Sequence, residues 1–255
     1  MDQLAVPHAL QDSVRTLARR SPDHRRVGPF TLRYNPGWPI PPANYAIPDR
    51  DAEPTAAEVA ELVGAFRELE RVPRLEFLPV CAPAVEPALL AAGFAVENRA
   101  PLLAVEPGGL LQPEPVAGLV VSEPERDADY YAAAGVQHLG YGQTGEPTEG
   151  EVAWLRGARE NGGVAALARV ADGTPVAAGG CSAPVDGLTE LAGLAVAAGH
   201  RRRGIGAAVS AYLTARAFER GCRVVWLEPG DADVERIYAK IGYRRVGDKL
   251  DMSLS

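Results

Sequence analysis

Cysteine is scarce in this sequence, and long hydrophobic runs are missing. The three cysteines, Cys81, Cys181 and Cys222, are widely spaced, form no Cys-x-x-Cys pair and have no histidine at a metal-ligand spacing. Each lies in or beside a hydrophobic stretch, which favours a small buried side chain in a reducing compartment over a disulfide or a structural zinc site. No run approaches the ~18 apolar residues of a membrane helix, so we expect no membrane-spanning segment.

Positive charge is also in the minority. The 33 acidic residues outnumber the 26 basic ones, which gives a formal net charge of -7 and a pI of about 5.2. Nucleic-acid binding needs a basic surface to neutralise phosphates, so we expect no nucleic-acid partner. The acidic balance is weakly compatible with a cationic substrate, although solubility is the simpler explanation. The start, Met1-Asp2-Gln3, lacks the basic and apolar regions of a secretory signal, and we expect a cytoplasmic protein.

The length and composition are those of a globular protein. The 255 residues suffice for one large domain or two small ones, and the 47% hydrophobic and 23% charged fractions are ordinary. The turn-rich stretch 106–115 is the best boundary, which gives domains 1–115 and 116–255. In the first we expect a proline-rich loop at 35–42, strands at 30–34, 75–79 and 95–105, and helices at 4–19, 54–70 and 85–92.

The second half predicts a mixed α/β fold. Asp172-Gly173 and Asp186-Gly187 each separate two apolar runs, a strong signal for antiparallel hairpins with type I′ turns. We therefore expect antiparallel strand pairs at these turns, and helices elsewhere in this half. Its strands are expected at 119–122, 164–170, 175–181, 188–196, 223–228 and 244–254, and its helices at 128–139, 148–161, 206–220 and 233–241.

The two halves are related by an internal repeat. When the chain is shifted by 149 positions, Arg74 falls on Arg223, and Gly93-Phe94 falls on Gly242-Tyr243 without a gap. Helix, strand, helix and strand coincide in the same order. We interpret this agreement as an internal duplication.

One stretch of the second half has the properties of an anion site. The strand 188–196 leads through a turn into a helix that begins near Gly206. Glycine at 204 and 206 lets the backbone turn sharply and approach a ligand, and the first N–H groups of a helix point outward without partners. Together with the helix dipole, these groups bind anions such as a diphosphate. Three consecutive arginines at 201–203 oppose the dipole unless an anion is present, which disfavours a purely structural turn.

This stretch resembles the GNAT superfamily of acyl-CoA-dependent N-acetyltransferases. It is neither a Walker A loop, since the terminal Gly-Lys-Ser/Thr is absent, nor a Rossmann loop, since position 209 is valine. Arg201-x-x-Gly204-x-Gly206 matches the family signature R/Q-x-x-G-x-G/A, and Tyr238 with Gly242-Tyr243 is similar to the family's closing segment. The resemblance covers about residues 118–255. It implies an α/β fold of two GNAT-like halves, each with a mixed, mostly antiparallel, splayed sheet flanked by helices.

The resemblance further implies acetyl-CoA as co-substrate and no metal. Gly193 would permit a bulge that splays two strands, and the backbone of Leu194, Ala195 and Val196 would then pair with the pantetheine arm. The diphosphate would be held by the loop of Arg201, Arg202, Arg203, Gly204, Ile205, Gly206 and Ala207. Family members often carry asparagine at the turn after the fifth strand, where it contacts CoA. Here the turn 229–233 has no asparagine, and Asp231 or Asp233 can cap the helix that follows.

Two residues match catalytic positions of the family. Tyr238 corresponds to the general acid that protonates the departing CoA thiolate; its alternative is packing against a strand. Glu190 corresponds to a glutamate that some members use as general base, because an ammonium group must lose a proton before it attacks. Its alternative is an exposed strand residue or a hydrogen-bonding partner. His138 and Tyr141 can line the acceptor site, although solvent-facing or packing roles are the simpler expectation.

These features predict an acetyl-CoA-dependent N-acetyltransferase acting on a primary amine of a small molecule. Direct attack is expected, because no cysteine has a histidine placed as its base. The alternatives are a non-catalytic acyl-CoA-binding or regulatory module, and an acetyltransferase of protein N-termini or lysines. The repeat places Ala52–Ala57, without glycine or arginine, where the second half has its loop. Domain 1–115 is thus expected to be a degenerate GNAT-like domain that does not bind CoA, and the oligomeric state stays open.

Overall fold

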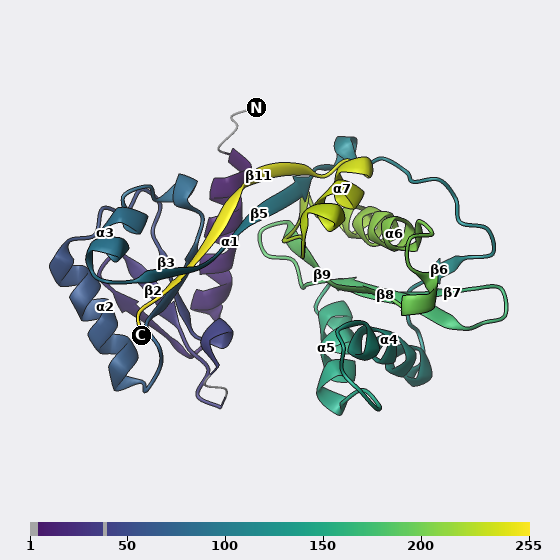
Figure 1. Ribbon diagram of the computed structural model, residues 1–255, viewed down its shortest axis with the longest axis horizontal. Coiled ribbons are helices and arrows are strands. Elements are labelled where there is room, and N and C mark those ends of the chain that lie inside the picture. Colours follow the sequence, from purple (N-terminus) through teal and green to yellow (C-terminus); the bar gives the residue numbers. More distant parts are fainter. Residues whose placement is uncertain (1–4, 38–39) are drawn as a thin grey trace. The chain divides into compact units, whose positions relative to one another are not determined.

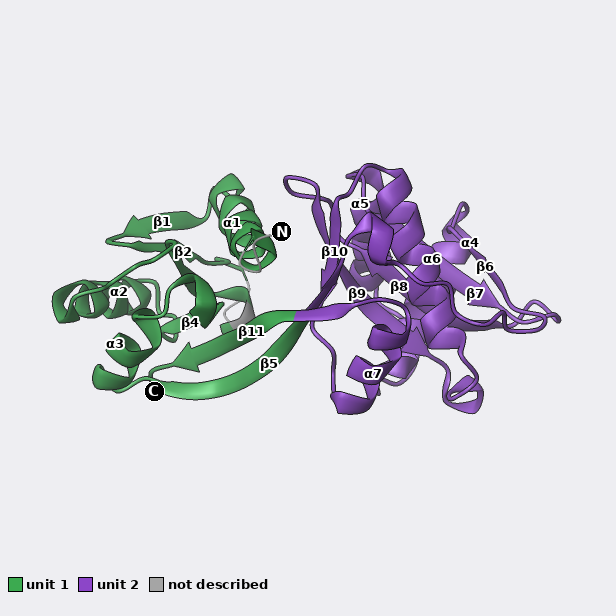
Figure 2. Ribbon diagram, turned by 90° about the horizontal axis from the view of Figure 1, so that it is seen from above, with its two compact units in different colours: residues 1–102, 246–255 green, residues 103–245 purple. Residues whose placement is uncertain are grey.

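The computed structural model describes residues 5–37 and 40–255, which form two compact units (Figure 1, Figure 2). Unit 1 consists of the chain up to Leu102 together with Val246–Ser255, and unit 2 consists of Leu103–Arg245. Leu4, expected in the first helix, and Trp38 and Pro39, expected in the proline-rich loop, lie outside the described residues. No helix in the described ranges is both long and apolar enough to cross a membrane.

Unit 1 has a mixed sheet with helices on both faces. Its strands follow the order β1-β2-β3-β4-β11-β5, with a parallel β3–β4 pair and an antiparallel β4–β11 pair. Along β3, Ala46 belongs to the core under α2 and α3, whereas Tyr45 and Ile47 pack with Ala18 of α1 on the other face. The elements are α1 (Ala5–Arg20), β1 (His24–Val27), β2 (Phe30–Arg33), β3 (Tyr45–Pro48), α2 (Ala56–Glu68), β4 (Arg74–Phe77), α3 (Val85–Ala91), β5 (Ala95–Val105) and β11 (Arg244–Ser253).

Unit 2 is organised in the same way. The end of β5 is followed in its sheet by β10, β9, β8, β7 and β6, and only β9 and β10 pair in parallel. Val209 of α6 packs in the core on one face, and Ala133 of α4 with Leu155 of α5 in the core on the other. The elements are β6 (Val120–Ser122), α4 (Asp127–Gly140), α5 (Glu149–Glu160), β7 (Val164–Arg169), β8 (Pro175–Cys181), β9 (Leu188–Val196), α6 (Ile205–Glu219), β10 (Val224–Leu227) and α7 (Ala232–Lys240).

The expected elements and the fold class are confirmed, with boundaries that differ by a few residues. Two short strands of unit 1, β1 and β3, were not expected from the sequence, because four residues beside turns or prolines give little periodic signal. Both hairpins form. At Asp186-Gly187 both φ angles are positive, at 51° and 77°, as a type I′ turn requires. At Asp172-Gly173 only Gly173 has positive φ, so the type I′ prediction is wrong there. The Val170 N–H donates to the Thr174 carbonyl, the Gly173 N–H donates to the Val170 carbonyl, and the pairing shifts at Ala168/Arg169.

The internal repeat is visible in the order of the elements. The succession α2-β4-α3-β5 recurs as α6-β10-α7-β11, and α6 begins at Ile205, 149 positions after the start of α2 at Ala56. The closing strands are exchanged between the two copies. β11 pairs with β4, with Leu250 opposite Phe77, and β5 pairs with β10, with Ala104 opposite Trp226. The compact units therefore divide at Leu102 and Val246 rather than at the expected residue 115.

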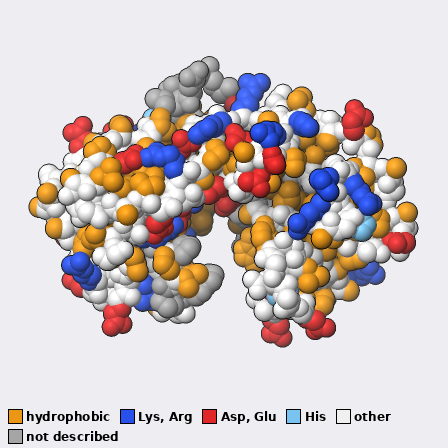
Figure 3. Space-filling model, viewed as in Figure 1, with side chains coloured by type: hydrophobic (Ala, Val, Ile, Leu, Met, Phe, Trp, Pro, Cys, Tyr) orange, Lys and Arg blue, Asp and Glu red, His pale blue; other side chains and the backbone are white. Residues whose placement is uncertain are grey.

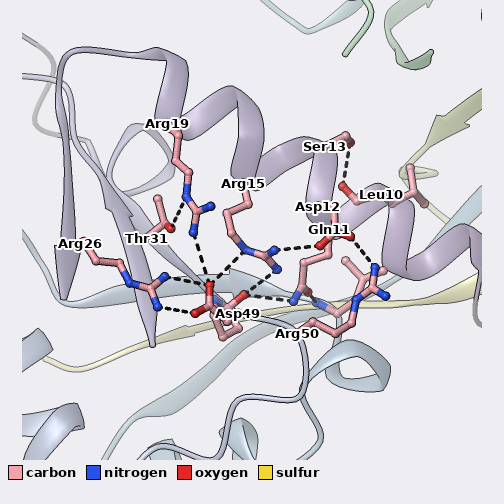
Figure 4. Close-up of polar contacts among 12 residues, drawn as sticks. Leu10, Gln11, Asp12, Ser13, Arg15, Arg19, Arg26, Thr31, Asp49 and Arg50 are labelled. Carbon is pink, nitrogen blue, oxygen red and sulfur yellow. Dashed lines mark hydrogen bonds and ion pairs between the residues drawn. The ribbon is translucent and has the colours of Figure 1, made fainter. Parts of the chain in front are cut away.

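Helix α1 is fixed to unit 1 by buried polar contacts (Figure 4). Gln11 is 2% exposed; its amide nitrogen donates to the Pro48 carbonyl at 3.3 Å, and its amide oxygen accepts from the Leu78 N–H at 2.8 Å. Asp49, the residue after Pro48, carries a carboxylate that faces three arginines, Arg15, Arg19 and Arg26. The hydrogen bond from Arg26 lowers the pKa of Asp49. One glutamine thus satisfies the backbone of two separate segments.

Replacing Gln11 with methionine should destabilise unit 1 by about 1–3 kcal/mol. The change keeps the volume but leaves the Leu78 N–H buried without a partner. Urea unfolding followed by far-UV circular dichroism would measure the loss. Gln143→Met makes the same change at an exposed position and should leave the unfolding midpoint unchanged. Equal midpoints for both variants would show that the Gln11 contacts do not stabilise the fold.

Candidate active site

Strand β9 carries a bulge near its end. Ala178 of β8 pairs with Ala195, and Gly180 pairs with Ala192. Gly193 and Leu194 of β9 therefore both lie opposite one residue of β8, Gly179. Gly193 has a φ of +66°, which other residues adopt only with strain. The bulge expected at Gly193 is therefore present.

The pairing of β9 with β10 ends before the bulge. The parallel partners of β10 are Leu188, Thr189 and Glu190, and the described pairing of the two strands ends there. On the side of β9 that faces β10, residues 191–196 have no strand partner among the described residues. An extended ligand can add to such an edge as a strand does.

Side chains of α4 hold the bulge in place. The Gln137 amide nitrogen donates to the Gly193 carbonyl at 2.6 Å, and the Tyr141 hydroxyl donates to the Leu194 carbonyl at 3.4 Å. A Cβ at Gly140 would lie 2.6 Å from the Ala195 side chain, so glycine lets the end of α4 approach β9 closely. The bulge is thus a supported structure rather than a loose segment.

The N-terminus of α6 lies against the same end of β9. Gly204 caps the helix with a φ of +80°, and the first bond of the helix runs from Ala208 N–H to the Gly204 carbonyl. The preceding N–H groups, of Ile205, Gly206 and Ala207, have no acceptor one turn back. A Cβ placed on Gly206 would lie 3.7 Å from Val196 and 4.0 Å from Leu194. The N-terminus of α6, which has no side-chain cap, therefore adjoins the bulged end of β9.

The arginines of the turn are exposed, and one of them contacts β9. Arg202 and Arg203 face solvent, and Arg202 has a φ of +60°. The Arg201 guanidinium donates through Nε to the Val196 carbonyl at 3.0 Å. In this structure the Val196 carbonyl, which was expected to pair with a pantetheine arm, therefore already has a partner.

Tyr238 lies in the core under α6. It is 5% exposed, and its ring packs edge-on against Tyr243 with centroids 5.4 Å apart. Burial raises the pKa of Tyr238 to about 12; the nearby Ser210 hydroxyl acts in the opposite direction, and Tyr141 adds to the rise. The phenol therefore keeps its proton at neutral pH.

Sequence reasoning missed the polar residues beside Tyr238. Ser210 and Thr214 are fully buried on α6, and the Thr214 hydroxyl bonds the Ser210 carbonyl and the Tyr243 hydroxyl, each at 2.7 Å. Their spacing of four residues on a hydrophobic helix face was the available signal. They form a small polar cluster around the two tyrosine rings.

Glu190 lies on the opposite face of the sheet from Tyr238. Leu191 points into the core under α6, so by strand alternation Glu190 and Ala192 point toward the face covered by α4 and α5. Glu190 is partly exposed, and its backbone exchanges hydrogen bonds with Ser182. The two expected catalytic residues thus approach the splayed strands from different sides.

His138 fastens the loop that follows α4. It is 8% exposed; its Nδ1 lies 2.9 Å from the Glu151 carboxylate and its Nε2 lies 3.1 Å from the Thr144 carbonyl. Both partners are acceptors, so the imidazolium form, in which both ring nitrogens donate, satisfies both contacts. The hydrogen bond to Glu151 raises the pKa of His138, while bonds from Thr148 and His138 lower the pKa of Glu151 to about 2. His138 therefore has a structural role.

The cysteines and the Asp231 turn have structural roles as well. All three cysteines are buried, and burial raises the pKa of Cys81 to about 12 and raises those of Cys181 and Cys222. Such thiols are poor nucleophiles. Asp231 caps α7 by accepting from the N–H groups of Asp233 and Val234, as expected. Across residues 5–37 and 40–255, no three histidine, cysteine or acidic side chains gather as a metal site.

Comparisons with known proteins identify the family of this region. Residues 124–243 match the model of the acetyltransferase (GNAT) family. A GCN5-related N-acetyltransferase from Kribbella flavida is 28% identical, with a TM-score of 0.80 over 97% of this chain and 95% of that one. One from Sphaerobacter thermophilus is 13% identical, with a TM-score of 0.69 over 89% and 76% of the two chains. A tandem GNAT protein from the clavulanic acid biosynthesis pathway is 10% identical, with a TM-score of 0.62 over 100% and 96%. A search of curated proteins finds no match.

The two less similar structures share the fold. The resemblance to the GNAT superfamily seen in the sequence is confirmed, and residues 124–243 form a GNAT acetyltransferase domain.

The imidazole of His138 should titrate above 6.5. Its imidazolium stabilises the loop fully below the unfolded pKa near 6.5, and this contribution is lost as the pH rises through the raised folded pKa. The Glu151 contribution is present above ~4.3 and fades as the pH falls toward 2. NMR titration of the His138 ring would give its pKa. Glu151→Gln should lower the pKa of His138. An unchanged pKa in that variant would contradict the contact between the two side chains.

Proposed function

We propose that this chain, with a GNAT domain at residues 124–243, is an acetyl-CoA-dependent N-acetyltransferase that acts on the primary amine of a small molecule. The observation that carries the proposal is the meeting of two features in unit 2. The open edge of β9 from Leu191 to Val196 adjoins the glycine-capped N-terminus of α6. An acyl donor with an extended arm and a diphosphate needs both features, side by side.

The residues present fit such a donor. The outward N–H groups of Ile205, Gly206 and Ala207 would hold the diphosphate, and exposed Arg202 and Arg203 would add positive charge. The backbone of Leu194, Ala195 and Val196 would pair with the pantetheine arm. The side chains of Tyr141 and Arg201 now occupy two carbonyls of this edge, so they would have to move or share them.

The proposed reaction uses one proton acceptor and one proton donor. The donor supplies a thioester carbonyl. The Glu190 carboxylate would take one proton from the ammonium group, so that the neutral nitrogen can attack that carbonyl, form the C–N bond and break the C–S bond. Tyr238, whose phenol proton is retained through burial, would give that proton to the CoA thiolate and would regain one from the second proton that the acylated nitrogen loses. The buried, weakly acidic thiols favour direct attack over a cysteine-bound acyl group.

The N-terminus of α2, which corresponds to that of α6 in the repeat, is already capped by side chains. This difference supports one binding site per chain, in unit 2. At the N-terminus of α2, Thr55 accepts from the Glu58 N–H, and the Glu58 carboxylate accepts from the Thr55 N–H. This capping box satisfies the helix end with a negatively charged side chain, which would repel a phosphate. At α6 no side chain caps the helix.

Gly206→Glu should abolish binding of CoA. The added carboxylate would enter the diphosphate site, whereas Gly206→Ala adds only a methyl group, in ordinary contact with Val196 and Leu194. Calorimetry should give one site per chain for the natural protein and for Gly206→Ala, and none for Gly206→Glu. Two sites per chain, or normal binding by Gly206→Glu, would refute this assignment.

Tyr238→Phe should lower kcat by ~10²- to 10⁴-fold, because it removes the proton donor and keeps the ring. The affinity for CoA should stay within about twofold, since the ring still packs against Tyr243. Steady-state kinetics with a primary amine, together with calorimetry, would separate the two effects. Full activity of the variant would make Tyr238 a packing residue. Binding of acetyl-CoA without turnover by the natural protein would favour a regulatory module.

A further inference from the structure

Strands β3 and β4 of unit 1 part soon after they pair. Their recorded pairing joins Ala46 to Leu75. The Asp49 N–H donates to the Pro29 carbonyl, on the β2 side of β3. Because a trans peptide unit points its C=O and N–H in opposite directions, the Pro48 carbonyl points toward β4. Proline has no N–H to give to that strand, so the pairing stops with an acceptor turned toward the gap between the two strands.

A side-chain amide lies between two backbone groups that regular strands would join directly. If the register of Ala46 and Leu75 continued, the Leu78 N–H would donate to the Pro48 carbonyl. Instead, the Leu78 N–H donates to Oε1 of Gln11 at 2.8 Å. Nε2 of Gln11 in turn donates to the Pro48 carbonyl at 3.3 Å (Figure 4). The carboxamide of α1 is thus inserted into the parallel pair as one additional peptide group would be.

The gap lies inside unit 1, and its chemistry matches an amide. Charged and hydrophobic side chains are interspersed over the surface of the unit (Figure 3), whereas Gln11 is 2% exposed and Leu78 is 5% exposed. The Pro48 carbonyl also accepts from Arg15 at 3.0 Å. A buried N–H and a buried carbonyl each need a partner. A group that accepts and donates on the two sides of one carbon satisfies both, and a carboxamide is such a group.

Unit 2 has a counterpart of this helix and of this parting. α1 covers the face of unit 1 opposite α2, as α4 covers the face of unit 2 opposite α6. On α4, Gln137 and Tyr141 donate to carbonyls of the β9 bulge, beyond the point where β9 and β10 cease to pair. They are four residues apart, as Gln11 and Arg15 are on α1. The described bond of Gln137 goes to β9, whereas Gln11 bonds both segments that flank its gap.

We propose that the gap between β3 and β4 is a carboxamide-binding site, and that the Gln11 side chain is its resident ligand. The two segments separate by the width of one amide, and α1 supplies that amide from within the chain. An extended ligand that enters between strands would find this place filled in unit 1. The inference concerns unit 1 alone, and it stands or fails independently of the function proposed for unit 2.

The test removes the amide and offers it again as a free molecule. Gln11→Ala keeps a good helix former and deletes the atoms of acetamide, which is the probe. We expect Gln11→Ala to lower the midpoint of urea unfolding of the full chain, and acetamide to restore it partly and saturably. A ligand that binds only the folded state raises the folding equilibrium constant by 1 + [L]/Kd, about tenfold at ten times Kd. In a 15N-labelled sample, the Leu78 N–H signal should return toward its natural position over the same range.

Two matched controls isolate the hydrogen bonds. Gln11→Met fills the gap with a hydrophobic side chain, so acetamide should not restore its midpoint. N,N-dimethylacetamide lacks the N–H that the Pro48 carbonyl needs, so it should not restore Gln11→Ala. An unchanged midpoint for Gln11→Ala, or an equal effect of acetamide on Gln11→Ala and Gln11→Met, would overturn the assignment.

A second variant covers the case in which Gln11→Ala does not fold. In Gln11→Glu the ionised carboxylate can still accept from the Leu78 N–H but cannot donate to the Pro48 carbonyl, whereas the protonated carboxyl does both. Its folded pKa should therefore lie above the ~4.3 of an unfolded glutamate, and the stabilisation should be lost as the pH rises through that folded pKa. The deficit in urea midpoint relative to the natural protein should narrow from pH 7 to pH 5. A deficit that is the same at both values would refute the site.

Discussion

The site in unit 2 depends on one break in strand pairing. β9 and β10 pair only as far as Glu190 and Trp226, one residue before β10 ends at Leu227, and β9 continues through the bulge at Gly193 without this partner. An open strand edge has unsatisfied backbone groups, which proteins normally cover. Here side chains of Tyr141 and Arg201 bond two of those carbonyls without closing the edge with another strand. The break therefore costs little in the free protein and leaves backbone groups that a ligand can use.

The two copies of the repeat differ at the helix end that forms the proposed diphosphate site in unit 2. α2 and α6 hold equivalent positions after a strand of each sheet. α2 begins with a threonine–glutamate capping box, whereas α6 begins with glycine in a left-handed conformation. The capping box uses the N–H groups of its own helix end, so the same fold becomes more self-sufficient and less able to bind an anion. Unit 1 has a hydrophobic core of its own, and its capping box stands where unit 2 has a helix end without a side-chain cap.

The sequence predicted what depends on neighbouring residues. The cap at Asp231 follows from a local conformational preference and is present, and the bulge at Gly193, which the family resemblance implied, is present as well. The exchange of β5 and β11 was not predictable, because a strand pattern does not reveal which distant strand it pairs with. The Arg201–Val196 contact was also missed. Its guanidinium looked like a ligand group, and only the structure shows that a carbonyl lies within its reach.

The faces of the sheet give the two expected catalytic residues different environments. Tyr238 lies among hydrophobic side chains of the core under α6, where the charged phenolate is disfavoured and the proton is held. Glu190 is partly exposed on the face covered by α4 and α5, where Trp226 of the neighbouring strand is its direct partner. In the proposed reaction the proton donor therefore lies on the buried side of the sheet and the proton acceptor on the partly exposed side. Because β9 and β10 separate the two faces, the proposed reaction would have to take place where their pairing ends, next to the bulge at Gly193.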